Sequence, residues 1–239
     1  MRLRRKVSKM GSRKNIESYL TNSLEEQNKN SRERSLFNTI PVIIKDFPPD
    51  NVSINDVLAE LEARIPLWFF QEVDVVYIGT FDMFIERQVE AIYEDGAIYV
   101  FNEQPTTEDF IESIGHEIAH ALETQRPEEI YGDQQLEAEF VGKRRRLRDI
   151  LAAHGYQYTD GDFLDPEYDT SFDDFLYKDV GYPTLTSLSS GLFMSPYAAT
   201  SLREYYANGF EWFFLKDEKV FLKKISPMLY YKLDILSNM

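Results

Sequence analysis

A chain of 239 residues, 43% of them hydrophobic, is long and apolar enough to fold around a core, which excludes a wholly disordered protein. The absence of cysteine excludes disulfides, thiolate metal ligands and a cysteine nucleophile, so imidazole and carboxylate groups would have to hold any metal ion. The net charge of −15 argues against a large nucleic-acid interface, because phosphate groups bind positively charged surfaces.

Residues 1–38 are polar and charged and precede a more apolar part of the chain, which begins at Ile40. Residues 1–14 contain seven Lys and Arg and no acidic residue, so the remaining chain carries a net charge of about −22. Such a composition is typical of a flexible arm, and its positive charge would suit contact with an acidic partner. We therefore predict a basic and polar N-terminal arm over 1–38, followed by one folded domain over 39–239.

The first half of the folded domain shows the patterns of an amphipathic helix and several strands. A helix is predicted over 55–64, where apolar residues recur at helical spacing. Residues 73–79 are rich in β-branched side chains, which predicts a strand. Residues 90–95 and 97–102 flank Gly96, and the Asp-Gly pair between them is typical of a tight hairpin turn. These strands predict a small, mostly antiparallel sheet.

The second half of the chain is mostly helical, which makes the expected fold class α+β. Long helices are predicted over 107–125, 133–153 and 201–216, and a shorter helix after Pro227. A threonine cap after a proline marks the start of the first of these helices.

Residues 156–190 are acidic, aromatic and rich in turn formers, so we expect a long surface excursion there, within an insertion at about 125–195. This excursion could cover or line a cleft and favour basic or unfolded peptides. No apolar run approaches the roughly 18 residues of a membrane span, and the N-terminus lacks the apolar core of a secretory signal. We expect no membrane partner and a cytoplasmic location, with release or packaging into a particle left open.

The predicted helix over 107–125 contains a His-Glu-x-x-His motif, formed by His116, Glu117 and His120. Side chains at i and i+4 lie one above the other on a helix, so both imidazoles can bind one ion. Glu117 lies beside them, where it can take a proton from a water whose pKa zinc lowers to about 7. The sequence therefore predicts Zn²⁺ held by His116 and His120, with Glu117 as general base, and a structural role for the remaining histidine, His154.

A catalytic zinc ion needs a third protein ligand, which in this chain is expected to be a carboxylate. Glu139 follows His120 after 18 intervening residues, a spacing that resembles that of gluzincin peptidases. Glu204 is the other candidate, although it also completes a capping box with Ser201 and could simply cap its own helix. Glu123, one turn after His120, could orient a ligand through a hydrogen bond.

Two sequence blocks together resemble a known family. The first is Gly-His-Glu-Ile-Ala-His at 115–120, and the second is Tyr197, six residues, then Glu-Tyr-Tyr-Ala at 204–207, with Phe210 following. This combination resembles the anthrax lethal factor-type zinc metallopeptidases, whose relatives include Pro-Pro endopeptidases. The resemblance runs from about residue 40 to the end of the chain, except for about 75 residues between the two blocks.

The resemblance implies a zincin-like fold with an active-site helix. It also implies that Glu204 is the third zinc ligand and that Tyr197 hydrogen-bonds the oxyanion of the reaction. The chain departs from the family at Asn208, where a second glutamate is usual. The implied substrates are peptides or proteins, with a hint of proline near the scissile bond.

Three functions follow from these observations. The first is a zinc metalloendopeptidase, in which the strand over 97–102 is a candidate edge for an extended peptide. The second is a catalytically silent zincin-fold protein that serves as a binding or assembly component and keeps its metal for stability. The third is a gluzincin-type peptidase that uses Glu139 as its third ligand.

Overall fold

The computed structural model describes residues 31–87 and 89–239, so most of the predicted arm lies outside the described residues. Five strands form one sheet: β1 (Glu33–Leu36), β2 (Ile40–Ile44), β3 (Val75–Ile78), β4 (Ala91–Glu94) and β5 (Ala97–Val100). Their order across the sheet is β1-β2-β3-β5-β4.

The sheet is mixed, so the prediction of a mostly antiparallel sheet was wrong. The β1–β2 and β4–β5 pairs are antiparallel, whereas β2–β3 and β3–β5 are parallel. Parallel neighbours need a crossover connection, which α2 (Ile54–Arg64) provides between β2 and β3.

The hairpin itself is confirmed, and it corrects a second expectation about the sheet. Asp95 (φ 48°) and Gly96 (φ 83°) join β4 to β5, and positive φ at both positions is typical of the turn predicted from the Asp-Gly pair. The strand over 97–102 is not an edge, because β5 has β3 on one side and β4 on the other. The edge beside the hairpin is β4.

The predicted boundary at residue 38 lies too late in the chain. β1 falls inside the predicted arm, and it pairs with β2 in the register Glu33↔Ile43. Leu36 is fully buried, which explains why these residues belong to the folded part.

The sheet has one face packed on helices. α4 (Thr107–Gln125) lies against β4 and β5 and against α2. Alternate strand residues such as Ile78 and Ile98 are buried on this side. Tyr77 and Tyr99 stack on the opposite face, with ring centroids 5.3 Å apart.

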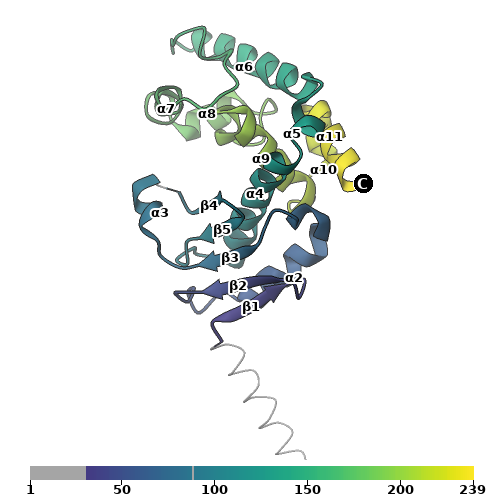
Figure 1. Cartoon of the computed structure of the whole chain (residues 1–239). Coiled ribbons are helices and arrows are strands. Elements are labelled where there is room, and N and C mark those ends of the chain that lie inside the picture. The colour runs from purple at the N-terminus through teal and green to yellow at the C-terminus, as the bar shows by residue number, and fades with distance from the viewer. Residues whose placement is uncertain (1–30, 88) are drawn as a thin grey trace, which may run out of the picture.

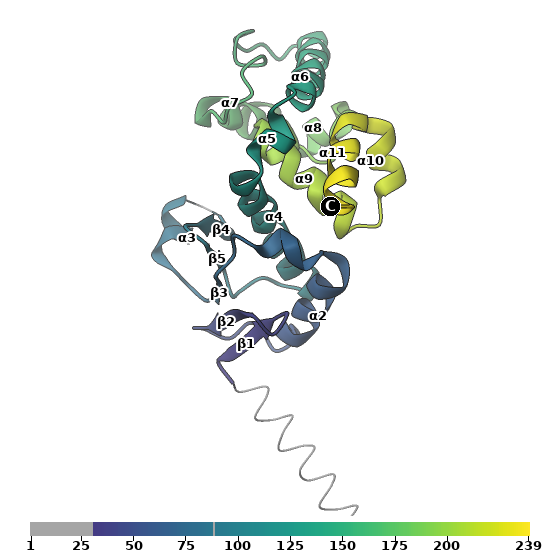
Figure 2. The same ribbon diagram turned by 45° about the vertical axis from the view of Figure 1, so that its right-hand side comes forward.

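The helical half of the domain follows α4. Its described elements include the predicted long helices, with boundaries within two residues of the predictions. In Figures 1 and 2 the sheet lies in the lower part of the molecule, most of these helices lie in the upper part, and α4 lies between. None of the helices in the described ranges is both long and apolar enough to cross a membrane. The remaining elements are α3 (Asp82–Arg87), α5 (Pro127–Tyr131), α6 (Gln135–Ala153), α7 (Thr170–Asp174), α8 (Tyr182–Leu188), α9 (Leu202–Phe214), α10 (Lys219–Ile225) and α11 (Pro227–Ser237), with the short helical segments η1 (Leu67–Phe70), η2 (Phe175–Val180) and η3 (Tyr197–Ala199).

The segment over 156–190 is only in part the predicted surface excursion, because some of its apolar side chains are packed into the domain while many of its other residues are exposed. Phe163, Phe172 and Leu176 are almost fully buried. The Arg144 guanidinium lies 4.0 Å from the centroid of the Phe172 ring. It donates to the backbone carbonyls of Asp162 and Asp165 within the segment and of Thr200 after it. The buried aromatic residues of the segment therefore join the core of the domain, which composition alone did not reveal.

Candidate active site

The motif residues lie in the middle of α4. The helix begins at the predicted threonine cap, where the Thr106 side chain accepts a hydrogen bond from Asp109 N at 3.1 Å. The helix ends at Gln125, just before Arg126 and Pro127. His116, Glu117 and His120 thus lie on a helix that many apolar side chains, such as Ile114 and Ile118, anchor in the core.

A second helix, α9, brings Glu204 to the histidines. Gly115 allows this approach, because a Cβ at this position would lie 2.4 Å from Leu215 Cδ1, just after α9. Ser201 caps the start of α9 by accepting from Glu204 N at 3.2 Å. The Glu204 side chain itself reaches the histidines, so Glu204 does more than cap its own helix.

His116, His120 and Glu204 form one compact group. The Nε2 atoms of the two histidines are 3.2 Å apart. Glu204 Oε2 lies 3.0 Å from His116 Nε2, and Glu204 Oε1 lies 3.6 Å from His120 Nε2. All candidate ligand atoms of this group lie within 4.8 Å of one another, so the three side chains could hold one metal ion.

The outer nitrogen of each imidazole is bound to a second carboxylate. His116 Nδ1 lies 2.7 Å from Glu211 Oε1, and His120 Nδ1 lies 2.6 Å from Glu123 Oε2. Ionised carboxylates only accept hydrogen bonds, so both Nδ1 atoms are the donors. In the neutral imidazoles the lone pairs are then on the two Nε2 atoms, which face each other and Glu204.

This arrangement concentrates acceptors around one point. Glu204 Oε2 is buried and accepts no hydrogen bond of good geometry within the described part of the chain, despite the nearby His116 Nε2. Two lone pairs and a carboxylate that face one another repel unless a proton or a metal ion lies among them. The geometry would therefore suit a bound cation.

The pKa shifts of these residues also indicate that the group favours positive charge on the imidazoles and negative charge on Glu204. Burial lowers the pKa of both imidazoles, but hydrogen bonds with the carboxylates outweigh it and raise the pKa of His120 to about 9. The pKa of His116 is raised well above its ordinary value by Glu204 and Glu211 against the same burial. Burial would also raise the pKa of Glu204, yet the histidines hold it below its usual range. The carboxylates around the two imidazoles therefore favour positive charge at this point.

Glu117 lies between this group and the edge of the sheet. Its Oε2 accepts a hydrogen bond from Tyr93 N on β4 at 2.7 Å. Burial raises the pKa of the Glu117 carboxyl, and the two histidines oppose this shift. A raised pKa makes a carboxylate a better base near neutral pH.

Tyr197 is held on η3 by a link to α9. Ser195 Oγ donates to Asn208 Oδ1 at 2.6 Å and accepts from Ala198 N at 3.1 Å, which fixes the turn that carries Tyr197. Asn208 Nδ2 donates in turn to Glu204 O at 3.0 Å. Burial raises the pKa of the Tyr197 phenol, and Glu204 adds to the shift, so the hydroxyl keeps its proton for donation.

A cavity of about 380 Å³ opens beside the group, large enough for part of a small ligand. It is lined by His116, Glu117 and Tyr197, by Ala91 of the edge strand and by Asn208. The predicted base and the predicted oxyanion donor thus share one cavity with a predicted metal ligand.

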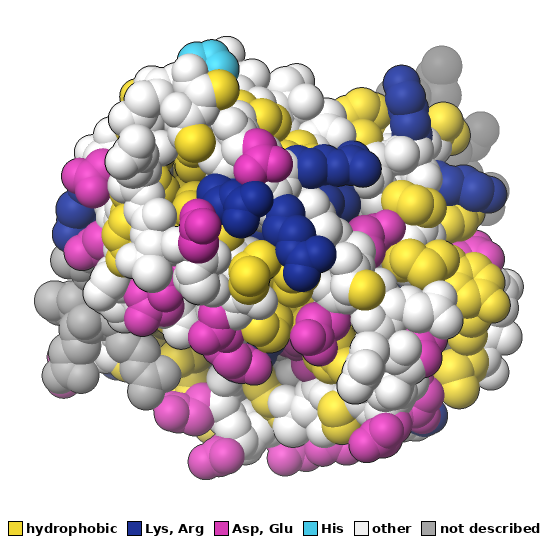
Figure 3. Space-filling model, turned by 90° about the horizontal axis from the view of Figure 1, so that it is seen from above, with side chains coloured by type: hydrophobic (Ala, Val, Ile, Leu, Met, Phe, Trp, Pro, Cys, Tyr) yellow, Lys and Arg dark blue, Asp and Glu magenta, His cyan; other side chains and the backbone are white. Residues whose placement is uncertain are grey.

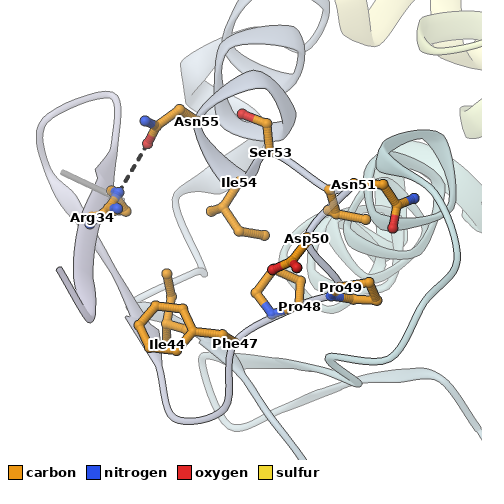
Figure 4. Close-up of a pocket in the computed structure, with 11 residues that line it drawn as sticks. Arg34, Ile44, Phe47, Pro48, Pro49, Asp50, Asn51, Ser53, Ile54 and Asn55 are labelled. Atoms are coloured by element: carbon orange, nitrogen blue, oxygen red, sulfur yellow. Dashed lines mark hydrogen bonds between the residues drawn. The ribbon is translucent and has the colours of Figure 1, made fainter. Parts of the chain in front are cut away.

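Another cavity, of about 470 Å³, lies at the start of α2 and is lined by the 47–55 segment, Arg34 and Ile44 (Figure 4). Figure 4 shows Arg34 hydrogen-bonded to Asn55, and Asp50 is the carboxylate among the lining residues. With no histidine in its lining, this cavity does not offer the donor set of the group on α4 and α9.

The structure does not bring Glu139 to the histidines. Both Glu139 oxygens are occupied elsewhere, since they accept from Tyr205 OH, Met228 N and Leu229 N. The group that could hold a metal contains Glu204 in its place. The geometry therefore gives no support to the gluzincin-type alternative.

Glu211, whose carboxylate binds Nδ1 of His116, was not identified from the sequence. Its signal was its position seven residues after Glu204, which puts both acids on the same face of one helix two turns apart. Glu123 does make the suggested hydrogen bond to a ligand histidine, and it is also held by Tyr131 OH and Arg203. His154 ends α6, with Nδ1 bonded to Ile150 O at 2.8 Å.

Comparisons of the chain with protein-family models, with curated proteins and with solved structures found no match. The resemblance drawn from the two sequence blocks therefore stays a prediction. The case for function depends on the geometry of the residues themselves.

Proposed function

We propose that this protein is a zinc-dependent metalloendopeptidase of zincin-like architecture, with His116, His120 and Glu204 as the metal ligands. One observation carries the proposal: three acceptor groups, one buried and two half-buried, converge on one point, and Glu117 lines the cavity beside them. A structural metal site has no need for a further carboxylate or for an open cavity next to the ligands.

Zinc fits the donor set of this group. Two imidazole nitrogens and one carboxylate are the ligands of many catalytic zinc sites, and three protein ligands leave a position open for water. Glu211 and Glu123 bind the outer nitrogens of the two histidines, which fixes the orientation of the rings and raises their basicity.

In the proposed reaction a bound zinc ion would activate water and polarise the scissile carbonyl. The Glu117 carboxylate accepts a proton from the attacking water and then delivers it to the leaving amine. The Tyr197 hydroxyl donates a hydrogen bond to the oxygen on which negative charge develops. The neutral Tyr197 and the basic Glu117 expected for these roles agree with the directions of their pKa shifts.

The substrate backbone would add to the sheet along β4. The Tyr93 N–H points away from β5, as its bond to Glu117 shows, and Ala91, two residues earlier, faces the same way in an antiparallel strand. Ala91 also lines the cavity. An extended peptide paired with this edge would pass in front of the metal ligands, which favours an endopeptidase.

The test is cleavage of a peptide library, read by mass spectrometry, with zinc content measured on the same samples. Glu117→Gln should keep its zinc and lose cleavage by about 10²-fold or more, because the base is removed and the ligands are not. Glu108→Gln, an exposed acid on the same helix, is the matched control and should cleave like the wild type. A chelator should abolish cleavage in both active proteins.

Two results would refute the proposal in different ways. Full zinc occupancy without any cleavage would favour a catalytically silent protein that binds or assembles with a partner. Equal cleavage by wild type and Glu117→Gln would exclude the assigned base.

A further inference from the structure

A separate cavity of about 480 Å³ lies between α6, the loop at 191–192 and the junction of α10 with α11. None of the metal-site residues lines it. Figure 3 looks down on the part of the molecule that carries α6, and Lys and Arg side chains gather near the centre of that face. Three cations line the cavity: Lys143, Arg146 and Lys224.

Lys143 is a buried cation, with 6% of its surface exposed. Among the described residues its ammonium donates to neutral groups, namely the carbonyls of Leu192 and Ile225 and the Ser226 hydroxyl. Burial lowers the pKa of this ammonium to about 8, so it is still mostly charged at pH 7. Its field therefore acts in a region of low dielectric constant, where it is poorly screened.

One carboxylate, Glu139, also lines the cavity, but it is committed to other donors. It accepts hydrogen bonds from the backbone N–H groups of Met228 and Leu229 at the start of α11, and from Tyr205 OH. The positive end of α11 thus offsets part of its charge. With one acid against three bases, the lining has a net positive charge.

Arg146 and Lys224 are both exposed, and no ion pair is found for either within the described residues. Other cations of the domain do form ion pairs, for example Arg148 with Asp149 and Lys216 with Glu112. Unpaired cations that gather at one cavity are unexpected in a domain with such an excess of acid.

Two glycines keep the cavity open. A Cβ added to Gly142 or to Gly191 would meet no atom within 4 Å. Both glycines line the cavity, so the space above them is available to a ligand.

We propose that this cavity is a binding site for a phosphate group carried by a small molecule. The Arg146 guanidinium can bind two phosphate oxygens at once, Lys224 supplies a point charge, and the fixed charge of Lys143 lies below them. Three cations around one recess suit a compact dianion better than an extended acidic peptide, whose charges are spread along a chain.

The test uses the full chain with zinc bound, and measures binding of inorganic phosphate and of pyrophosphate by calorimetry at low ionic strength. The double variant Arg146→Ala with Lys224→Ala should lower the association constant by about tenfold or more, because charge-assisted hydrogen bonds are lost. Arg145→Ala is the matched control: it removes an exposed charge from the same helix, but Arg145 does not line the cavity, so binding should change less than about twofold.

A second variant keeps all three cations. Gly142→Glu places a negative side chain in open space, so circular dichroism should show an intact fold while phosphate binding is lost. Unchanged binding in this variant or in the double variant would place the anion elsewhere, at the metal or on the N-terminal basic residues, and would overturn the proposal. Absence of binding to the wild type, or binding of hexaglutamate in place of phosphate, would overturn it as well.

Discussion

Glu211 binds His116 Nδ1 at 2.7 Å and lies 3.7 Å from Lys216 Nζ. We expect Glu211→Ala to weaken zinc binding by about 10- to 100-fold, because His116 loses the partner that fixes its ring and tautomer. Glu211→Gln retains an acceptor oxygen and should weaken binding less. Competition with a chromophoric chelator measures these affinities.

Glu112→Ala is the control for this comparison, since Glu112 binds the same lysine at 2.8 Å and, in the part of the chain that the structure describes, forms no hydrogen bond or ion pair with either histidine. It should bind zinc like the wild type. Equal losses in Glu112→Ala and Glu211→Ala would show that Lys216, and not the histidine contact, accounts for the effect.

The Ser195–Asn208 hydrogen bond gives a prediction about Tyr197. Ser195→Ala frees the turn before Tyr197, so we expect a fall in kcat of about tenfold with zinc content and KM nearly unchanged. Tyr197→Phe should cost more, about 10²-fold, because it removes the donor itself. In a double-mutant cycle, Ser195→Ala should have little further effect once Tyr197 is phenylalanine. Additive losses would contradict a role for Ser195 in placing the tyrosine.

The residues of the candidate site differ in how far sequence alone could identify them. His116, Glu117 and His120 are within five positions of one another, so a local pattern names them. The roles of Glu204 and Tyr197 were predicted from a family resemblance, because the fold, and not a local sequence pattern, decides how close these residues lie to α4. Glu211 could not be named from sequence, since its spacing to Glu204 is shared by any two acids on one helix face and its partner lies 95 residues away.

The close packing of α4 on α9 gives a prediction for two glycines. Gly115→Ala should destabilise the protein by about 1–3 kcal/mol, since the new Cβ would meet the buried Leu215 at 2.4 Å. Gly142→Ala, also in a helix, meets nothing within 4 Å and should stabilise by up to about 1 kcal/mol through helix propensity. Chemical denaturation measures both free energies of unfolding. Similar effects of the two substitutions would rule out the steric explanation.

Among the secondary-structure elements, those with a local cause were predicted best. α4 begins and ends where its cap and its apolar spacing predicted, because both signals lie within the helix. The order of the strands depends on contacts between segments far apart in sequence, and so the two parallel pairs were missed. The buried aromatic residues of 156–190 could not be told from surface ones, since a non-periodic segment carries no signal of its inner face.

The protein as a whole should respond to zinc in a pH-dependent way. The pKa of His120 is raised to about 9 from an ordinary value near 6.5. Protonation of His120 therefore stabilises the metal-free fold fully below pH 6.5, and this stabilisation is lost as the pH rises toward 9. Zinc binds the deprotonated rings, so its apparent affinity should rise by about tenfold per pH unit for each proton displaced. The increase in Tm on adding zinc should therefore grow from pH 6 to pH 8.5. If the increase in Tm on adding zinc did not change over this pH range, zinc binding would not be coupled to loss of protons. The His120→Ala variant should show no increase in Tm on adding zinc.

A long segment of the chain separates the two helices that carry the candidate metal ligands. His120 lies on α4 and Glu204 on α9, so an ion bound by both would close a ring of the chain that contains α5, α6, α7 and α8. A cross-link of this kind restricts the unfolded chain more than the folded one, much as a disulfide does. Amide hydrogens in α5 to α8 should then exchange more slowly with zinc present, although most of them lie far from the ion along the chain. The metal ion would then stabilise the helical half of the domain in addition to its proposed part in catalysis.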